Sequence, residues 1–224
     1  MTDSPWSSNA GRSPDTRRST RQQPGRLIEI ATVLLLAVAT VGSAWSAYQV
    51  ARWNGVETDD ARASAVFRID ASREYALATQ IVAYDSATVS QYAAAVSADN
   101  EPLQDFLRAT LVRPGFLPVF EKWEAQIAAG QIPTNLISDE DYLGDLFADA
   151  DAADAAAAAA TVRSEDAGAN ADDYIRLTLF FASALFFAGI TASFSNRLSK
   201  MILLFGAGAI LGVAGVLLAG YPIA

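Results

Sequence analysis

The chain lacks two residue types altogether: among its 224 residues there is no cysteine and no histidine. The lack of cysteine excludes disulfide bonds and thiol nucleophiles. The lack of histidine excludes the Ser-His-Asp triad and the histidine ligands of many zinc and haem sites. The sequence also contains no Walker phosphate loop, no glycine-rich dinucleotide fingerprint and no Gly-x-Ser-x-Gly elbow. We therefore expect no enzymatic activity, no cofactor and no metal site.

Long apolar runs are the most prominent feature that is present. Residues 27–47, 174–194 and 201–219 form runs of 21, 21 and 19 residues, each with at most one charged residue. At about 1.5 Å per residue, a helix of this length covers roughly 30 Å, the thickness of the hydrocarbon core of a bilayer. The sequence therefore predicts an all-α membrane protein with three transmembrane helices. Its expected partner is the lipid bilayer.

Charge is distributed unevenly around these runs and predicts their orientation. Residues 1–26 contain five Arg, and the turn at residues 195–200 contains two further basic residues. Residues 48–173 contain 22 Asp+Glu but only 8 Lys+Arg. Basic flanking segments stay on the cytoplasmic side of a membrane. We expect the N-terminus and the turn to be cytoplasmic, and residues 48–173 and the short tail 220–224 to be extracytoplasmic.

The first run raises an alternative, because a basic start followed by an apolar stretch is also typical of a cleaved signal peptide. Gly42-Ser43-Ala44 would offer small residues for cleavage. The run is longer than the usual core of a signal peptide, and the sequence continues beyond it without a helix breaker. We therefore favour an uncleaved anchor.

Two segments flank the first run and differ in composition. Residues 1–26 have almost no aliphatic residues, so we expect them to be disordered. Residues 48–100 contain no proline, and their apolar residues recur at helical spacing. This pattern predicts a long amphipathic helix, with a candidate break at Asn54-Gly55. Its buried face is expected to consist of Val66, Ile69, Leu77, Ile81, Tyr84, Tyr92 and Val96.

Prolines divide the rest of the outer domain. Short helices are predicted at residues 103–111 and 116–129, and Gly130 suits the C-cap of the second. The apolar face of that second helix consists of Phe116, Phe120, Trp123 and Ile127. A long, alanine-rich helix is then predicted from its N-cap at Ser138 to Tyr174. We expect these elements to form a helical hairpin outside the membrane.

The acidic segment that begins at Asp139 resembles a calcium loop only in part. Gly144 occupies the glycine position of an EF-hand, but Leu143 and Ala150 stand where calcium ligands are required. An ordinary solvated helix face explains the segment better. Because the outer domain is strongly negative and would repel phosphate, we exclude nucleic acid as a partner.

Small residues recur along the third apolar run. Gly208 and Gly212 are four residues apart, and Gly215 follows. Small side chains let helix backbones approach closely. Since the turn at 195–200 is short, the second and third transmembrane helices are expected to be neighbours that pack through these glycines. The alternative is that Gly208 and Gly212 form a contact between two copies of the chain.

Two stretches carry a resemblance to known proteins: AWSAYQVARWNGV at Ala44–Val56 and DDYIRLTLFFASALFFAGITASF at Asp172–Phe194. With them, most of the chain after residue 26 resembles a group of bacterial three-span membrane proteins that have an outer helical segment and no established activity. The resemblance implies a bacterial cytoplasmic (inner) membrane and the fold expected above. It implies no functional residues.

The sequence favours a non-enzymatic function. We expect a scaffold or accessory subunit whose acidic helical domain contacts another membrane protein, because catalytic signatures are absent and an amphipathic stripe is present. The alternative is a homo-oligomeric cation channel, in which the acidic domain would form an outer vestibule. The channel hypothesis is weakened by the lack of charged residues deep in the apolar runs. A carboxylate-based membrane hydrolase ranks third.

Overall fold

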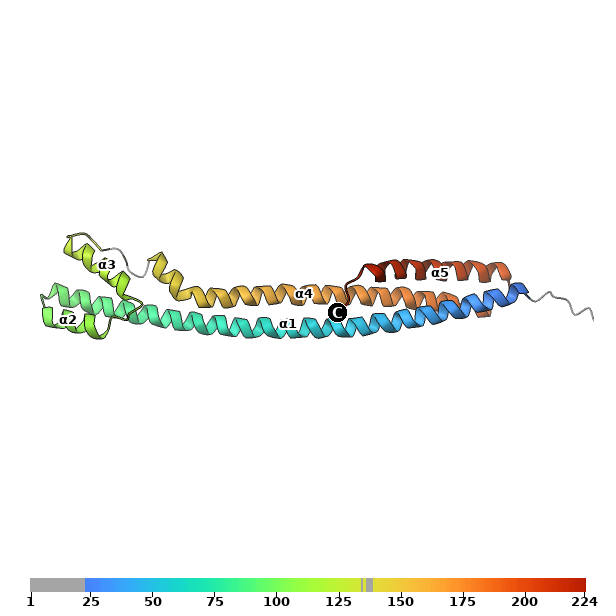
Figure 1. Ribbon diagram of the computed structural model, residues 1–224, viewed down its shortest axis with the longest axis horizontal. Helices are drawn as coiled ribbons and strands as arrows, with labels where there is room; N and C mark the ends of the chain where they lie inside the picture. Colours follow the sequence, from blue (N-terminus) through green and yellow to red (C-terminus); the bar gives the residue numbers. More distant parts are fainter. Residues whose placement is uncertain (1–22, 134, 136–138) are drawn as a thin grey trace, which may run out of the picture. The chain divides into compact units, whose positions relative to one another are not determined.

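The computed structural model describes residues 23–133, 135 and 139–224 (Figure 1). Every regular element in these described residues is helical. The elements are α1 (Gln23–Ser97), α2 (Glu101–Thr110), α3 (Leu117–Ala128), α4 (Glu140–Ile190), the short 3-10 helix η2 (Thr191–Ser193) and α5 (Arg197–Gly220). The prediction of an all-α protein is confirmed for this part of the chain. The disorder expected at residues 1–22 lies outside the described residues.

The described chain divides into two compact units. Unit 1 contains residues 23–48 and 173–222, and unit 2 contains residues 49–172 and 223–224. Helices α1, α4 and α5 are each long and apolar enough to cross a membrane, with mean hydropathies of 2.1, 1.8 and 2.5 over their most apolar stretches. The prediction of three helices able to span a membrane is therefore confirmed.

Helix α1 runs for 75 residues without interruption. It begins at Gln23, so residues 23–26 are helical and the disorder expected there is wrong. The break expected at Asn54-Gly55 is also wrong, because both residues are helical. Thr58 Oγ1 donates to the carbonyl oxygen of Asn54 at 2.7 Å, and the residues around this dipeptide continue the regular helix. Local turn propensity is a weak signal that a long helix can override.

In unit 2, α1 and α4 lie side by side and antiparallel (Figure 1). Their contact consists largely of small side chains, and on α4 Ala150, Ala157, Ala160, Ala167 and Ala171 are buried. Polar pairs accompany them: Ser64 Oγ lies 2.8 Å from Thr161 Oγ1, and Arg163 Nε donates to Asp60 Oδ1 at 3.0 Å. Small residues on both helices allow the backbones to approach closely, so many weak contacts replace a few large ones.

The buried face of α1 differs from the predicted one. Val66, Ile69, Leu77 and Tyr84 are 55%, 68%, 44% and 44% exposed, so the expectation that they are buried is wrong. Buried instead are Ser64, Ala78, Asp85 and Tyr92, which are spaced by multiples of seven residues. The reason is the composition of α4: its alanine face selects small partners on α1, and these lie roughly 110° around the helix from the large apolar residues.

The end of unit 2 where α1 stops is closed by α2 and α3. Asn100 caps α2 by accepting a hydrogen bond from the Leu103 backbone N–H at 3.2 Å. Gly130 has φ +67° directly after α3, the left-handed conformation expected at a C-cap, and its N–H donates to Ile127 O at 2.9 Å. Both short helices and this cap are confirmed. They enclose a core cluster of Tyr92, Ala95, Leu107, Phe116, Phe120, Trp123 and Tyr142.

Helix α4 begins at Glu140, and Asp139 provides its cap. The Asp139 carboxylate accepts a hydrogen bond from the Tyr142 N–H at 3.2 Å, and its second oxygen accepts one from Lys122 Nζ at 2.8 Å. These two bonds hold the pKa of Asp139 below its usual range, the bond from Lys122 being the larger cause. The predicted cap, Ser138, lies outside the described residues.

In unit 1, α1, α4 and α5 pack as three helices. Gly42 of α1 lies so close to Phe181 of α4 that a methyl group in its place would stand 2.5 Å from two ring carbons. Tyr174 of α4 is fully buried, and its hydroxyl donates to the carbonyl oxygen of Pro222 at 3.0 Å. Its ring lies 5.6 Å from that of Tyr221. These contacts hold the end of α5 against α4.

Candidate functional site

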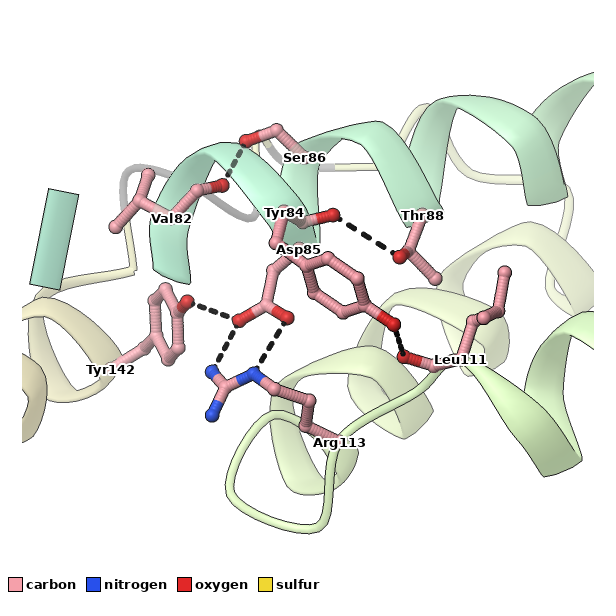
Figure 2. A network of polar contacts seen from close by, with 8 residues as sticks. All are labelled: Val82, Tyr84, Asp85, Ser86, Thr88, Leu111, Arg113 and Tyr142. Atoms are coloured by element: carbon pink, nitrogen blue, oxygen red, sulfur yellow. Dashed lines mark hydrogen bonds and ion pairs between the residues drawn. The ribbon is translucent and has the colours of Figure 1, made fainter. Parts of the chain in front are cut away.

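Asp85 is the most buried acidic residue of unit 2, at 2% exposure. Burial of a carboxylate is costly unless its oxygens are paired. Here Arg113 Nε donates to Oδ1 at 3.0 Å, and Arg113 Nη2 donates to Oδ2 at 2.5 Å. The hydroxyl of Tyr142 donates to Oδ2 at 2.6 Å (Figure 2). The carboxylate is therefore fully engaged by one cation and one phenol.

Three separate segments position this polar cluster. Asp85 projects from α1, Arg113 from the connection between α2 and α3, and Tyr142 from the first turn of α4. The connection is itself fixed, because Tyr84 Oη donates to the carbonyl oxygen of Leu111 at 3.2 Å (Figure 2). The carbonyl oxygen of Arg113 accepts the backbone N–H of Phe116 at 3.0 Å. The cluster thus joins α1, α4 and the α2–α3 connection at one point.

Electrostatics keep Arg113 and Tyr142 each in one protonation state at neutral pH. The hydrogen bond to Asp85 raises the pKa of Arg113, so the guanidinium stays charged. Burial, followed by the hydrogen bond to Asp85, raises the pKa of the Tyr142 phenol well above its ordinary value. The phenol therefore stays neutral and remains a donor. The cluster contains one negative and one positive charge, and its chemistry is that of a structural clamp.

A pocket of about 260 Å³ lies beside the clamp. Asp85 and Tyr142 form part of its wall, together with the rings of Phe116 and Trp123 and with Ser86 of α1. The Ser86 hydroxyl donates to the carbonyl oxygen of Val82 at 2.6 Å (Figure 2), which leaves its oxygen to accept hydrogen bonds. The pocket has mixed aromatic and polar walls and the size of one large side chain.

A second surface of unit 2 is the exposed apolar stripe of α1, which we define as Val66, Ile69, Leu77 and Tyr84. At 100° per residue these side chains lie on one face of the helix, and Arg73 lies among them. Single exposed apolar residues are common on proteins, whereas several on one helix face form a candidate interaction surface. The stripe spans 18 residue steps, or roughly 27 Å of helix.

The glycines predicted to pack the second and third spans are all described. A Cβ added at Gly208, Gly212 or Gly215 would meet no atom of another element within 4 Å. The expected close contact with α4 at these positions is therefore not present in the described part of the chain. The fully buried small residues of α5 are Ala207 and Ala214, which face the bundle one position before Gly208 and Gly215. A contact between copies through Gly208 and Gly212 stays a prediction.

Sequence reasoning missed Asp85, Arg113 and Tyr142 as a cluster. A signal was present: Asp85 follows Ile81 by four residues and precedes Tyr92 by seven, so it shares their helix face. Acids at such positions are rarely buried unless they are paired, which predicts a partner. Nothing in the sequence identifies Arg113 as that partner, because its position depends on the fold of α2 and α3.

Among the described residues, no group of three acidic side chains is close enough together to hold a metal ion. Asp139, the first residue of the calcium-like segment, is engaged by Lys122 and by the N-terminus of α4.

Comparison of the chain with models of protein families, with curated proteins and with solved structures gave no match. The resemblance to bacterial three-span membrane proteins therefore stays a prediction.

Proposed function

We propose that this protein is a multi-pass membrane protein that acts as a scaffold or accessory subunit, and that its acidic helical domain binds another membrane protein. The observation that carries the proposal is the exposed apolar stripe of α1. Fully burying a large apolar side chain contributes about 1.5–3 kcal/mol, and within its own chain α1 leaves the four residues of the stripe between 44% and 68% exposed. A partner that covers the stripe would gain this free energy.

The charge around the stripe supports selectivity for one kind of partner. The segment from residue 48 to residue 173 has 22 acidic and 8 basic residues. A negative surface favours encounter with a positive one and disfavours other acidic proteins. The proposed partner therefore presents an apolar helix face with basic residues at its edges.

The described spans support an accessory role over a channel. The three apolar runs contain only Glu29 and Arg176 as charged residues, and each lies close to an end of its run. Ion pathways through a membrane usually contain ionisable groups at depth, and these runs have none there. We place the protein in a bacterial cytoplasmic membrane, with its N-terminus inside and the acidic domain outside, because of the basic flanks.

Site-specific photo-crosslinking tests the proposal. A photoreactive phenylalanine analogue is placed at Leu77, within the stripe, or at Thr79, which is also exposed but lies about 160° further around α1. The full-length protein is irradiated in membranes of the cells that produce it. We expect one reproducible adduct with a different membrane polypeptide from position 77 and none from position 79.

A second measurement uses a variant with a charged residue in the stripe. Leu77→Glu should abolish co-purification of that polypeptide in mild detergent, and the thermal stability of the chain should fall little because Leu77 is 44% exposed. Equal adducts from positions 77 and 79 would overturn the proposal. Adducts between copies of the chain alone would replace it with self-association through the stripe.

A further inference from the structure

Unit 1 contains an apolar groove between the start of α1 and the first half of α5. Its volume is about 740 Å³. On α1 it is lined by Leu27, Ala31 and Leu35, and on α5 by Met201 and Phe205, among others. Leu27 is 69% exposed and Phe205 81% exposed, so the walls of the groove are open to the surroundings of unit 1. In a protein whose three long helices span a membrane, those surroundings are lipid.

The depth of the groove comes from small residues. Gly208 and Ala209 line it on α5, and a Cβ at Gly208 would meet nothing of another element within 4 Å. Gly208 therefore leaves space beside α1 instead of closing a helix contact. From Arg197 to Ala209 the groove follows α5 for roughly 18 Å, which is about the thickness of one leaflet's hydrocarbon region.

One end of the groove is cationic. Arg197 is its only charged lining residue, and within the described residues no ion pair involves Arg197. It is also the first residue of α5, whose start is capped by Asn196 Oδ1 accepting the Leu198 N–H at 3.0 Å, and the positive end of the helix dipole favours an anion here. Residues 174–224 contain no acidic residue, and on α1 the lining residues Leu27 and Ile28 stand between Arg26 and Glu29.

We propose that this groove is a binding site for an anionic phospholipid, with one acyl chain along Gly208 and the phosphate at Arg197. The inference relies on the membrane insertion of the three spans and goes beyond the proposed scaffold function, since it assigns a ligand to unit 1. Charge complementarity selects the headgroup: a basic pocket between transmembrane helices is the usual binding site for anionic headgroups. A zwitterionic lipid would fill the same apolar space without this gain.

The test uses full-length protein reconstituted in nanodiscs that contain phosphatidylglycerol and phosphatidylcholine in equal amounts. Native mass spectrometry after release from the discs measures which lipid is retained. We expect wild-type protein to retain phosphatidylglycerol preferentially. Arg197→Gln should reduce this preference by about fivefold, the factor given by one basic residue near an anionic surface, while lipid is still retained.

The second part of the test fills the groove with a larger side chain. Gly208→Leu should lower the amount of both retained lipids, whereas Gly212→Leu, one turn further along α5 and outside the groove lining, should not. Arg176→Gln is the matched charge control, since Arg176 lies on α4 and its guanidinium pairs with Asp173. Thermal stability of each variant is recorded, so that a folding defect in Gly208→Leu leaves Arg197→Gln to decide.

Three results would overturn the site: equal retention of the two lipids by wild-type protein, a preference that Arg197→Gln leaves unchanged, or equal loss of lipid in the two glycine variants. A dimer that lacks lipid, and that Gly208→Leu dissociates, would assign the groove to a second copy of the chain. None of these results bears on the stripe of α1, so the scaffold proposal stands or fails separately.

Discussion

The guanidinium of Arg113 faces the carboxylate of Asp85 with two donors, Nε at 3.0 Å from Oδ1 and Nη2 at 2.5 Å from Oδ2. The carboxylate is 3% exposed and the guanidinium side chain 33% exposed. The pair therefore links a buried position of α1 to a connection that is partly in solvent. Its geometry is the two-donor arrangement in which arginine binds a carboxylate most selectively.

Removing the guanidinium should loosen unit 2 at this point. Arg113→Leu leaves a buried carboxylate with Tyr142 as its remaining partner. Breaking a buried pair costs about 3–5 kcal/mol, and the partial exposure of Arg113 reduces this to about 2–3 kcal/mol. The free energy of local opening, measured by amide hydrogen exchange over residues 79–95, should fall by that amount. Arg62→Leu is the control, because its ion pair with Asp59 is exposed and should contribute less than about 1 kcal/mol.

A double variant separates the pair from simple loss of packing. In Asp85→Leu/Arg113→Leu both charges are removed, so no uncompensated carboxylate remains. The double variant should lose clearly less stability than the sum of the two single variants. Strict additivity of the two losses would show that Arg113 does not stabilise unit 2 through Asp85.

The tyrosines of the core cluster should make unit 2 sensitive to alkali. Burial, followed by the hydrogen bond to Glu124, raises the pKa of Tyr92 to about 12. Above pH 10 the unfolded chain loses this proton before the folded chain does, so folding stability is complete below pH 10 and falls as the pH rises towards 12. Ultraviolet absorption of phenolate should show one component with a midpoint near pH 12 that is missing in Tyr92→Phe. A wild-type titration identical to that of the variant would contradict the assignment.

Several parts of the fold were predictable because they depend on local or compositional signals. The three apolar helices follow from the length of their apolar runs, and the cap at Gly130 follows from a glycine placed after an amphipathic helix. Helices α2 and α3 follow from the spacing of prolines and large apolar residues such as Phe116 and Phe120. Each of these signals is contained within about 20 residues of sequence.

The buried face of α1 was not predictable from the large apolar residues. We expected Val66, Ile69 and Leu77 to be buried, but the partner helix offers alanine, and alanine pairs best with small residues. The informative pattern was the heptad spacing of Ser64, Ala71 and Ala78. Patterns based on hydrophobicity give little weight to alanine and serine, so they identified the exposed stripe instead. For the same reason the sequence pattern predicted that α5 packs through Gly208, whereas the buried residue is Ala207.

The close approach of Gly42 to Phe181 gives a stability prediction for unit 1. Gly42→Ala would place a methyl group 2.5 Å from carbons of a ring that is 3% exposed. Overpacking of this kind costs about 1–3 kcal/mol. The thermal midpoint in mild detergent should fall, while Gly189→Ala, where a methyl group meets nothing within 4 Å, should leave it unchanged or slightly raised. If the clash is the cause, Phe181→Leu should partly restore the midpoint of Gly42→Ala, and failure of this rescue would reject it.

The proposed orientation can be tested with single cysteines, because the chain has none of its own. Ser97 is exposed at the end of α1, in the segment that we place outside, and Ser195 is exposed between η2 and α5, in the turn that we place inside. The basic flanks at Arg197 and Lys200 should hold that turn in the cytoplasm. In intact cells, a membrane-impermeant thiol reagent should therefore label Ser97→Cys but not Ser195→Cys. After the membrane is permeabilised both variants should react, which shows that the second thiol is accessible. Labelling of position 195 but not of position 97 in intact cells would invert the topology, and the acidic domain would then have to find its partner in the cytoplasm.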